Sequence, residues 1–107
     1  MIHSDDLKLT PFSFGLSEEP SQQWALAPSL NDGQIQHGIW ECGPGTFELE
    51  FEWSETAFIL SGRAEVENTQ TGETFSLTPG TLVQFARGSV WKWRVPWQIR
   101  KVFTSVV

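Results

Sequence analysis

The chain has 107 residues, the length of one domain, and its six tryptophans and eight phenylalanines supply large apolar side chains for a core. Thirteen acidic against seven basic residues give a net charge of -6, which opposes binding to nucleic acid or to anionic lipid. An apolar run of about 18 residues is absent, and residues 1–6 lack the features of a signal peptide, so we expect a cytoplasmic protein without a membrane partner.

Residues 1–21 mix serine, proline, glycine and acidic residues with little periodicity, which predicts an irregular, partly ordered N-terminal arm. From residue 35 onward, short runs of β-branched and aromatic residues are separated by glycine, proline, asparagine and threonine, a pattern typical of an all-β domain. We therefore divide the chain into an arm over residues 1–21 and a β-barrel domain over residues 22–107.

The clearest predicted strand covers residues 47–53, Phe-Glu-Leu-Glu-Phe-Glu-Trp, in which apolar and acidic residues alternate strictly. A period of two places the apolar side chains on one face and the three carboxylates on the other. This pattern indicates a half-buried antiparallel strand with a solvated acidic stripe.

Later strands are separated by glycine-containing turns, of which Thr71-Gly72 is typical of a hairpin. They are predicted over residues 57–60, 64–67, 81–85, 91–95 and 99–107. Because no stretch longer than two turns keeps an apolar face free of glycine or proline, we expect no helix. Seven or more short strands at this spacing indicate a sandwich or barrel. The single Cys42 has no disulfide partner and is expected to be a small buried apolar residue.

Several residues follow the spacing of the two cupin motifs: Gly43, Leu49, Phe51, Glu55, Gly62, Gly80, Gly88 and Trp91. The chain resembles the cupins over residues 35–105, which implies a double-stranded β-helix, the jelly-roll barrel of that superfamily. The stretch 38–47, Gly-Ile-Trp-Glu-Cys-Gly-Pro-Gly-Thr-Phe, and the segments 93–95 and 100–103 are similar to the small cupins related to (S)-ureidoglycine aminohydrolase.

Many cupins hold a metal through histidines of these motifs, so the resemblance shows which positions of this chain would be the metal ligands. At the corresponding positions this chain has Leu49, Phe51 and Trp91, and only Glu55 is retained. Apolar side chains supply no nitrogen or oxygen ligand. We expect no metal and no other cofactor, and we interpret His37 as a surface or hydrogen-bonded residue rather than a ligand.

The candidate site is the barrel interior, which the inward-facing residues of the motif strands either fill as a core or line as an aromatic pocket. These residues are Leu49, Phe51, Trp53, Trp91 and Trp93. Glu55 is the candidate binding or catalytic carboxylate, or else a turn residue paired with an arginine or backbone amides, and Gln84 is a second candidate polar group. We expect Glu55 to lie among aromatic rings without a bound cation, so that Glu55→Gln keeps or increases the stability of the protein at neutral pH.

Three functions fit the sequence, and whether the protein is an enzyme stays open among them. The first is metal-free binding of a small metabolite in an aromatic-lined barrel pocket. The second is a metal-dependent enzyme acting on a C–N bond of a small polar substrate, as the resemblance to ureidoglycine aminohydrolase implies. The third is a structural or assembly module. We also expect a homodimer, because cupin-type barrels commonly pair and sheet edges need protection.

Overall fold

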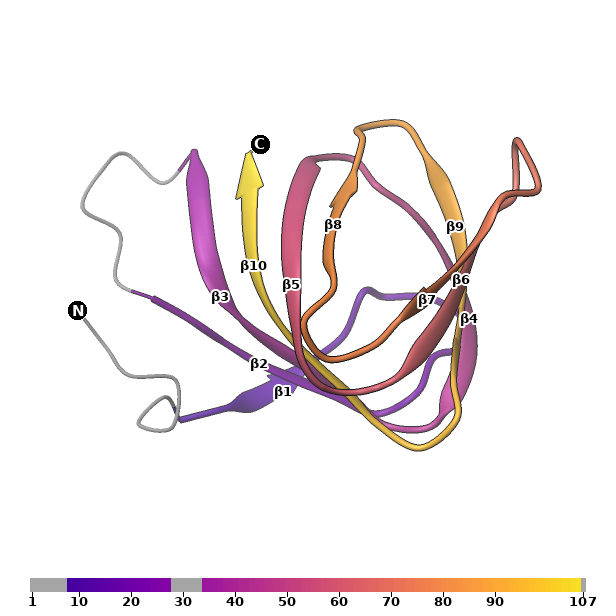
Figure 1. The fold of residues 1–107 in the computed structure, drawn as a ribbon. Helices are drawn as coiled ribbons and strands as arrows, with labels where there is room; N and C mark the ends of the chain where they lie inside the picture. The colour runs from indigo at the N-terminus through magenta and orange to yellow at the C-terminus, as the bar shows by residue number, and fades with distance from the viewer. Residues whose placement is uncertain (1–7, 28–33, 107) are drawn as a thin grey trace.

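The structure, a computed structural model, describes residues 8–27 and 34–106. The described residues form ten strands and no helix, arranged in two antiparallel sheets that face each other around a common core (Figure 1). The described part of the chain thus contains no helix able to span a membrane. The all-β prediction is confirmed, and the expected cytoplasmic location stays a prediction.

The larger sheet has six strands and the smaller sheet has four. In spatial order, the larger sheet contains β1 (Thr10–Phe12), β2 (Gln22–Leu26), β3 (Ile35–Cys42), β10 (Ile99–Val106), β5 (Ser54–Gly62) and β8 (Leu82–Phe85). The smaller sheet contains β4 (Gly45–Glu50), β9 (Val90–Val95), β6 (Ala64–Asn68) and β7 (Thr74–Leu77). Strands distant in sequence are therefore neighbours in both sheets, as in a jelly roll.

Alternation along the strands builds the core between the sheets. In β4, Phe47 and Leu49 are buried whereas Glu48 and Glu50 are exposed, as the sequence predicts. The strand ends at Glu50, and Phe51 begins the connection to β5, where its backbone is held by hydrogen bonds to Ser89 and Gly88. The predicted strand over residues 47–53 is therefore shorter than expected.

The turn that follows β5 requires glycine at position 62. Gly62 has a φ of +77°, a conformation that L side chains rarely adopt. A Cβ atom there would lie 1.9 Å from the backbone oxygen of Gln98. The turn predicted from Ser61-Gly62 is thus fixed both by backbone conformation and by close approach of the β9–β10 connection.

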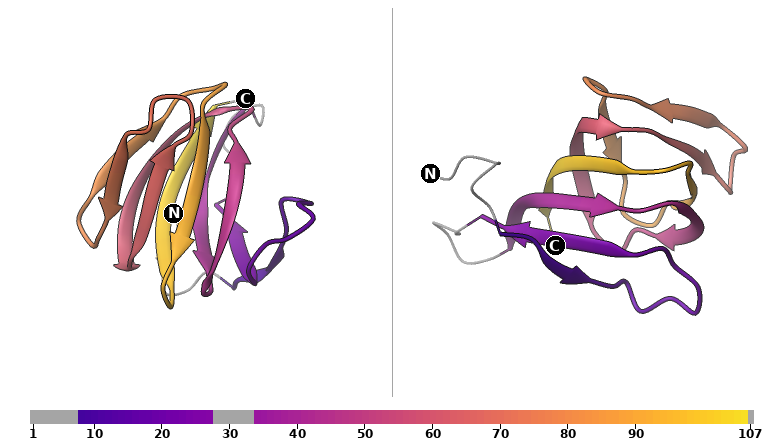
Figure 2. Two further views of the ribbon diagram at one scale, coloured as in Figure 1. Left: turned by 90° about the vertical axis from the view of Figure 1, so that its right-hand side faces the viewer. Right: turned by 90° about the horizontal axis from the view of Figure 1, so that it is seen from below.

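The N-terminal segment differs from the prediction. Strand β1 pairs with β2 and extends the edge of the larger sheet, as Figure 2 shows. Beyond it, Phe14 and Leu16 continue the alternation begun by Phe12, and all three side chains pack against the core. Burial of these apolar side chains orders a segment expected to be irregular. Residues 1–7 lie outside the described part.

Candidate ligand-binding site

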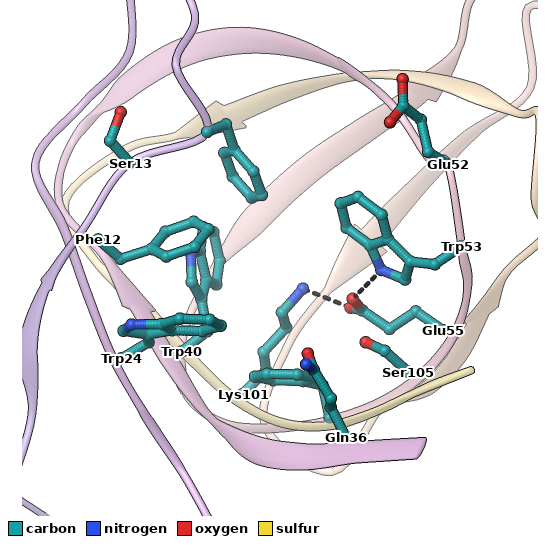
Figure 3. A pocket seen from close by; sticks show the side chains of 12 residues that line it. Phe12, Ser13, Trp24, Gln36, Trp40, Glu52, Trp53, Glu55, Lys101 and Ser105 are labelled. Atoms are coloured by element: carbon teal, nitrogen blue, oxygen red, sulfur yellow. Dashed lines mark hydrogen bonds and ion pairs between the residues drawn. The ribbon is translucent and has the colours of Figure 1, made fainter. Parts of the chain in front are cut away.

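A cavity of about 420 Å³ opens on the inner side of the larger sheet, between the N-terminal segment and the connection from β4 to β5 (Figure 3). Its apolar lining consists of Phe12, Phe14, Trp24, Trp40, Trp53 and Phe103. Its polar lining consists of Ser13, Gln36, Glu52, Glu55, Lys101 and Ser105. A mainly aromatic wall with a few polar groups is the usual composition of a small-molecule site.

The centre of the polar lining is an ion pair between Lys101 and Glu55. Lys101 Nζ lies 2.5 Å from Glu55 Oε2, and each side chain is only 5% exposed. The indole nitrogen of Trp53 donates a hydrogen bond of 3.0 Å to the other carboxylate oxygen, Oε1. Each oxygen of the buried carboxylate thus has its own donor, which offsets the loss of water around it.

Aromatic rings surround the ammonium group of Lys101. Its nitrogen lies 4.6 Å from the ring centroid of Trp40 and 5.2 Å from that of Trp93. The centroids of Phe85 and Phe103 are each 5.9 Å away. A cation over ring faces at these distances is attracted by their negative potential, which adds to the pairing with Glu55.

Sheet register brings the polar groups together. On β10, Lys101 and Ser105 are four positions apart, so both face the cavity. Ser105 lies opposite Gln36 of β3 on one side and opposite Glu55 of β5 on the other. The three strands therefore present an amide, a hydroxyl and a carboxylate in one row, four positions along the strands from a second row that contains Trp40 and Lys101.

Of the residues predicted from the sequence, Glu55 and Trp53 line the cavity. The structure places the other apolar candidates, Leu49, Phe51, Trp91 and Trp93, in the core. Phe51 and Phe85 stack with centroids 4.6 Å apart and planes inclined by 4°, so aromatic side chains fill this part of the barrel. Their contribution is to the packing of the barrel rather than to the wall of the cavity.

Gln84 lies away from the cavity. It is exposed on β8, whereas its neighbours Val83 and Phe85 are less exposed and pack with the core. Alternation along the strand explains this. Phe85 faces inward, so the residue directly before it, Gln84, must face outward. The interpretation of Gln84 as a polar group of the pocket is therefore corrected.

Sequence reasoning missed Lys101 and the aromatic wall supplied by Phe12, Trp24 and Trp40. Glu55 was expected to lack a cation, yet Lys101 is its closest partner. The available signal was the alternation of Ile99, Lys101 and Phe103 on one face of the last strand, which places a lysine among inward residues. An inward lysine needs a buried anion, and Glu55 was already the inward carboxylate.

The residues present do not fit a metal at the usual cupin position. The described part of the chain contains no group of three or more His, Cys, Asp or Glu side chains that could hold a metal ion. Leu49, Phe51 and Trp91 offer no ligand atoms beside Glu55. His37 is exposed, with Nδ1 2.9 Å from Thr104 Oγ1, in agreement with its interpretation as a hydrogen-bonded surface residue. His3 lies outside the described residues.

Comparison with known proteins identifies the family. Residues 30–103 match the EutQ-like cupin domain. The chain belongs to this family. No curated protein matches this EutQ-like cupin. The narrower resemblance to the ureidoglycine aminohydrolases stays a prediction.

Solved structures share the fold. The putative ethanolamine utilization protein EutQ from Salmonella typhimurium superposes with a TM-score of 0.81 at 18% identity, covering 99% of this chain and 84% of that one. The Clostridium difficile EutQ protein gives 0.81 at 17% identity, with 99% and 85% covered. A predicted oxalate decarboxylase from Thermotoga maritima gives 0.77 at 11% identity, with 100% and 98% covered. These neighbours confirm the predicted cupin jelly roll.

Proposed function

We propose that this EutQ-like cupin binds a small, flat, largely apolar metabolite in the aromatic cavity without a metal, and that Lys101 and Glu55 hold its polar end. The observation that carries the proposal is a buried ion pair in the wall of an open cavity. Replacing a buried ion pair with packed apolar residues is often neutral or stabilising, so stability alone does not account for its presence there.

The size and composition of the cavity support a small ligand. A volume of about 420 Å³ falls within the range of roughly 300–1,000 Å³ that is usual for small-molecule sites. The rings of Phe12 and Trp24, with centroids 4.5 Å apart, form one wall, and Trp40 lies beside Trp24 on the neighbouring strand. A flat molecule can stack against these rings and lose little conformational freedom on binding.

The other functions receive less support from the described residues. A metal-dependent enzyme acting on a C–N bond needs nitrogen or oxygen ligands where this chain has Leu49, Phe51 and Trp91. An assembly module has no use for a cavity lined by a buried charged pair. A catalytic role for Glu55 requires a substrate at the same place, so ligand binding is the first property to measure.

Binding of indole, a flat apolar probe, tests the proposal. Titration calorimetry should show saturable binding to the wild-type protein. Trp24→Ala, which removes part of the cavity wall, should weaken it about tenfold, equivalent to about 1.4 kcal/mol. Trp97→Ala is the matched control, because Trp97 is 63% exposed and does not line the cavity. Failure of the wild type to bind, or equal weakening by both variants, would contradict the proposal.

A further inference from the structure

The buried polar groups of the cavity form a compact set whose charges cancel. Lys101 and Glu55 carry opposite charges 2.5 Å apart, and both side chains are buried. Glu52, the other charged residue in the lining, is exposed at the side of the cavity formed by the β4–β5 connection. A ligand that reaches the pair therefore meets a donor and an acceptor side by side, in surroundings of low polarity.

Both partners keep hydrogen-bonding capacity. An ammonium group has three N–H donors, and the contact with Glu55 occupies one of them. A carboxylate offers about four acceptor sites, and Lys101 and Trp53 occupy two at Glu55. Gln36 and Ser105 stand in the same row as Glu55, and neither is hydrogen-bonded to another side chain of the lining (Figure 3).

The charge of the pair sets the charge of the ligand. An anion would be attracted by Lys101 but repelled by Glu55, and a cation would experience the reverse. Either would bring an uncompensated charge into a mostly aromatic cavity, which is unfavourable. An uncharged group with an acceptor and a donor on adjacent atoms matches both partners without that penalty.

Resting on the proposed function, we infer that the ligand is an uncharged planar ring compound with an amide-type edge, a carbonyl next to an N–H. The carbonyl oxygen accepts a hydrogen bond from Lys101 Nζ, and the N–H donates to a carboxylate oxygen of Glu55. The ring lies against the wall formed by Phe12, Trp24 and Trp40. The free amide of Gln36 and hydroxyl of Ser105 are placed to bind a further polar substituent beside that edge.

Three probes with the same ring and different charges test this inference: benzamide, benzoate and benzamidine. Titration of the wild-type protein at pH 7 should give benzamide the lowest dissociation constant, by about tenfold over either charged probe. Glu55→Gln leaves the positive charge of Lys101 and should move the preference toward benzoate. Lys101→Met leaves the negative charge of Glu55 and should move it toward benzamidine.

Glu50→Gln is the matched control, because it removes an exposed carboxylate of β4 that does not line the cavity and should leave the ranking unchanged. The wild-type ranking alone decides the inference where a core variant does not fold. Binding of indole together with a stronger preference for benzoate or benzamidine than for benzamide would overturn the amide inference and leave the proposed function standing. Absence of indole binding would overturn the proposed function itself.

Discussion

At the scale of single residues, Lys101 and Glu55 keep each other buried. Neither side chain would remain in an aromatic interior alone, because an unpaired charge there has lost its hydration without compensation. The cation near the rings of Trp40 and Trp93 and the indole donor of Trp53 complete the surroundings of the pair. The stability of the protein should therefore depend on both members together.

Glu55→Gln should lower the free energy of unfolding by about 3 kcal/mol, because it leaves the ammonium group buried without an anion. This reverses the expectation drawn from the sequence, which placed no cation beside Glu55. Urea denaturation at pH 7 measures the loss. The double variant Glu55→Gln with Lys101→Met should recover much of it, since no buried charge remains. A single variant as stable as the wild type would show that the pair is not a structural anchor.

Cys42 should be unreactive in the folded protein. Burial raises the pKa of its thiol from 9.0 to about 12, an effect opposed by the positive charge of Lys101 and reinforced by Glu19. Because the thiolate is the reactive form, iodoacetamide at pH 8 should modify Cys42 only after the protein is unfolded. Mass spectrometry of native and denatured samples provides the comparison, and rapid native modification would contradict the burial described here.

The same thiol should make stability depend on alkaline pH. A raised pKa in the folded state means that folding favours the protonated thiol, so its contribution is fully present below pH 9.0 and declines as pH rises toward about 12. Cys42→Ala lacks this titration. The free energy of unfolding of the wild type, relative to that of Cys42→Ala, should thus fall between pH 9 and about pH 12. A constant difference over this range would argue against a thiol pKa raised by burial.

At the scale of elements, Glu19 fastens the segment that follows β1 and forms part of the cavity wall. Its Oε1 accepts a hydrogen bond of 3.1 Å from the backbone N–H of Phe14, and its Oε2 accepts one of 3.2 Å from that of Leu16. Ser13 donates its hydroxyl to the same carboxylate. One side chain therefore organises the connection between the edge strand β1 and its neighbour β2.

Glu19→Ala should loosen this connection without unfolding the barrel. We expect faster amide hydrogen exchange at Phe14 and Leu16 and weaker binding of indole by several fold, because Phe14 lines the cavity. Glu18→Ala is the control, since Glu18 is exposed one position away. NMR or mass spectrometry measures the exchange. Equal rates in the two variants would mean that aromatic packing alone holds the segment.

The elements differ in how well the sequence predicts them. Alternation within one strand is local, so β4, β9 and β10 could be located to within a few residues, and the cupin spacing supplied their arrangement. Strand β1 has only three residues, and its pairing depends on β2, so no local pattern shows it. The pair between Glu55 and Lys101 spans 46 residues and exists only through the register of β5 and β10.

The cavity was less predictable than the barrel for the same reason. Its apolar wall comes largely from Phe12, Trp24 and Trp40, which lie before Gly43, where the cupin spacing begins, and partly in the segment expected to be irregular. The residues at the family's ligand positions lie in the interior, as the alternation predicts, and of the two alternatives that the sequence left open, core or pocket wall, they form the core. The alternation of inward and outward residues does not show how much volume the packed side chains leave empty.

At the scale of the whole molecule, the outer face of the larger sheet carries a row of exposed apolar side chains. Val102 of β10, Phe58 of β5 and Leu82 of β8 are direct cross-strand neighbours, and they are 37%, 41% and 70% exposed. Of the two neighbouring rows on this face, one contains Thr104, Thr56 and Gln84 together with His37, and the other contains the ion pair between Arg100 and Glu41, whose charges cancel. For a chain of net charge -6, this is a face on which two copies can meet without strong repulsion.

We predict that a second copy of the chain covers this row in a homodimer. Light scattering at high micromolar concentration should give twice the mass of the chain, and Phe58→Glu should convert the dimer to monomer by placing like charges at the contact. Trp97→Glu adds the same charge to another exposed aromatic position and should leave the dimer intact. A wild-type monomer, or dissociation by both variants, would contradict the use of this face.

The position of β10 has a consequence for how the protein is made. This strand follows every other described strand in the chain, yet it lies between β3 and β5 in the middle of the larger sheet (Figure 1). Synthesis on the ribosome proceeds from the N-terminus, so β3 and β5 emerge before the strand that joins them, each with an open edge exposed to other nascent chains. Lys101 arrives on that same strand. The sheet, the charged pair and the floor of the cavity are therefore completed together, in one late step after translation has passed residue 106.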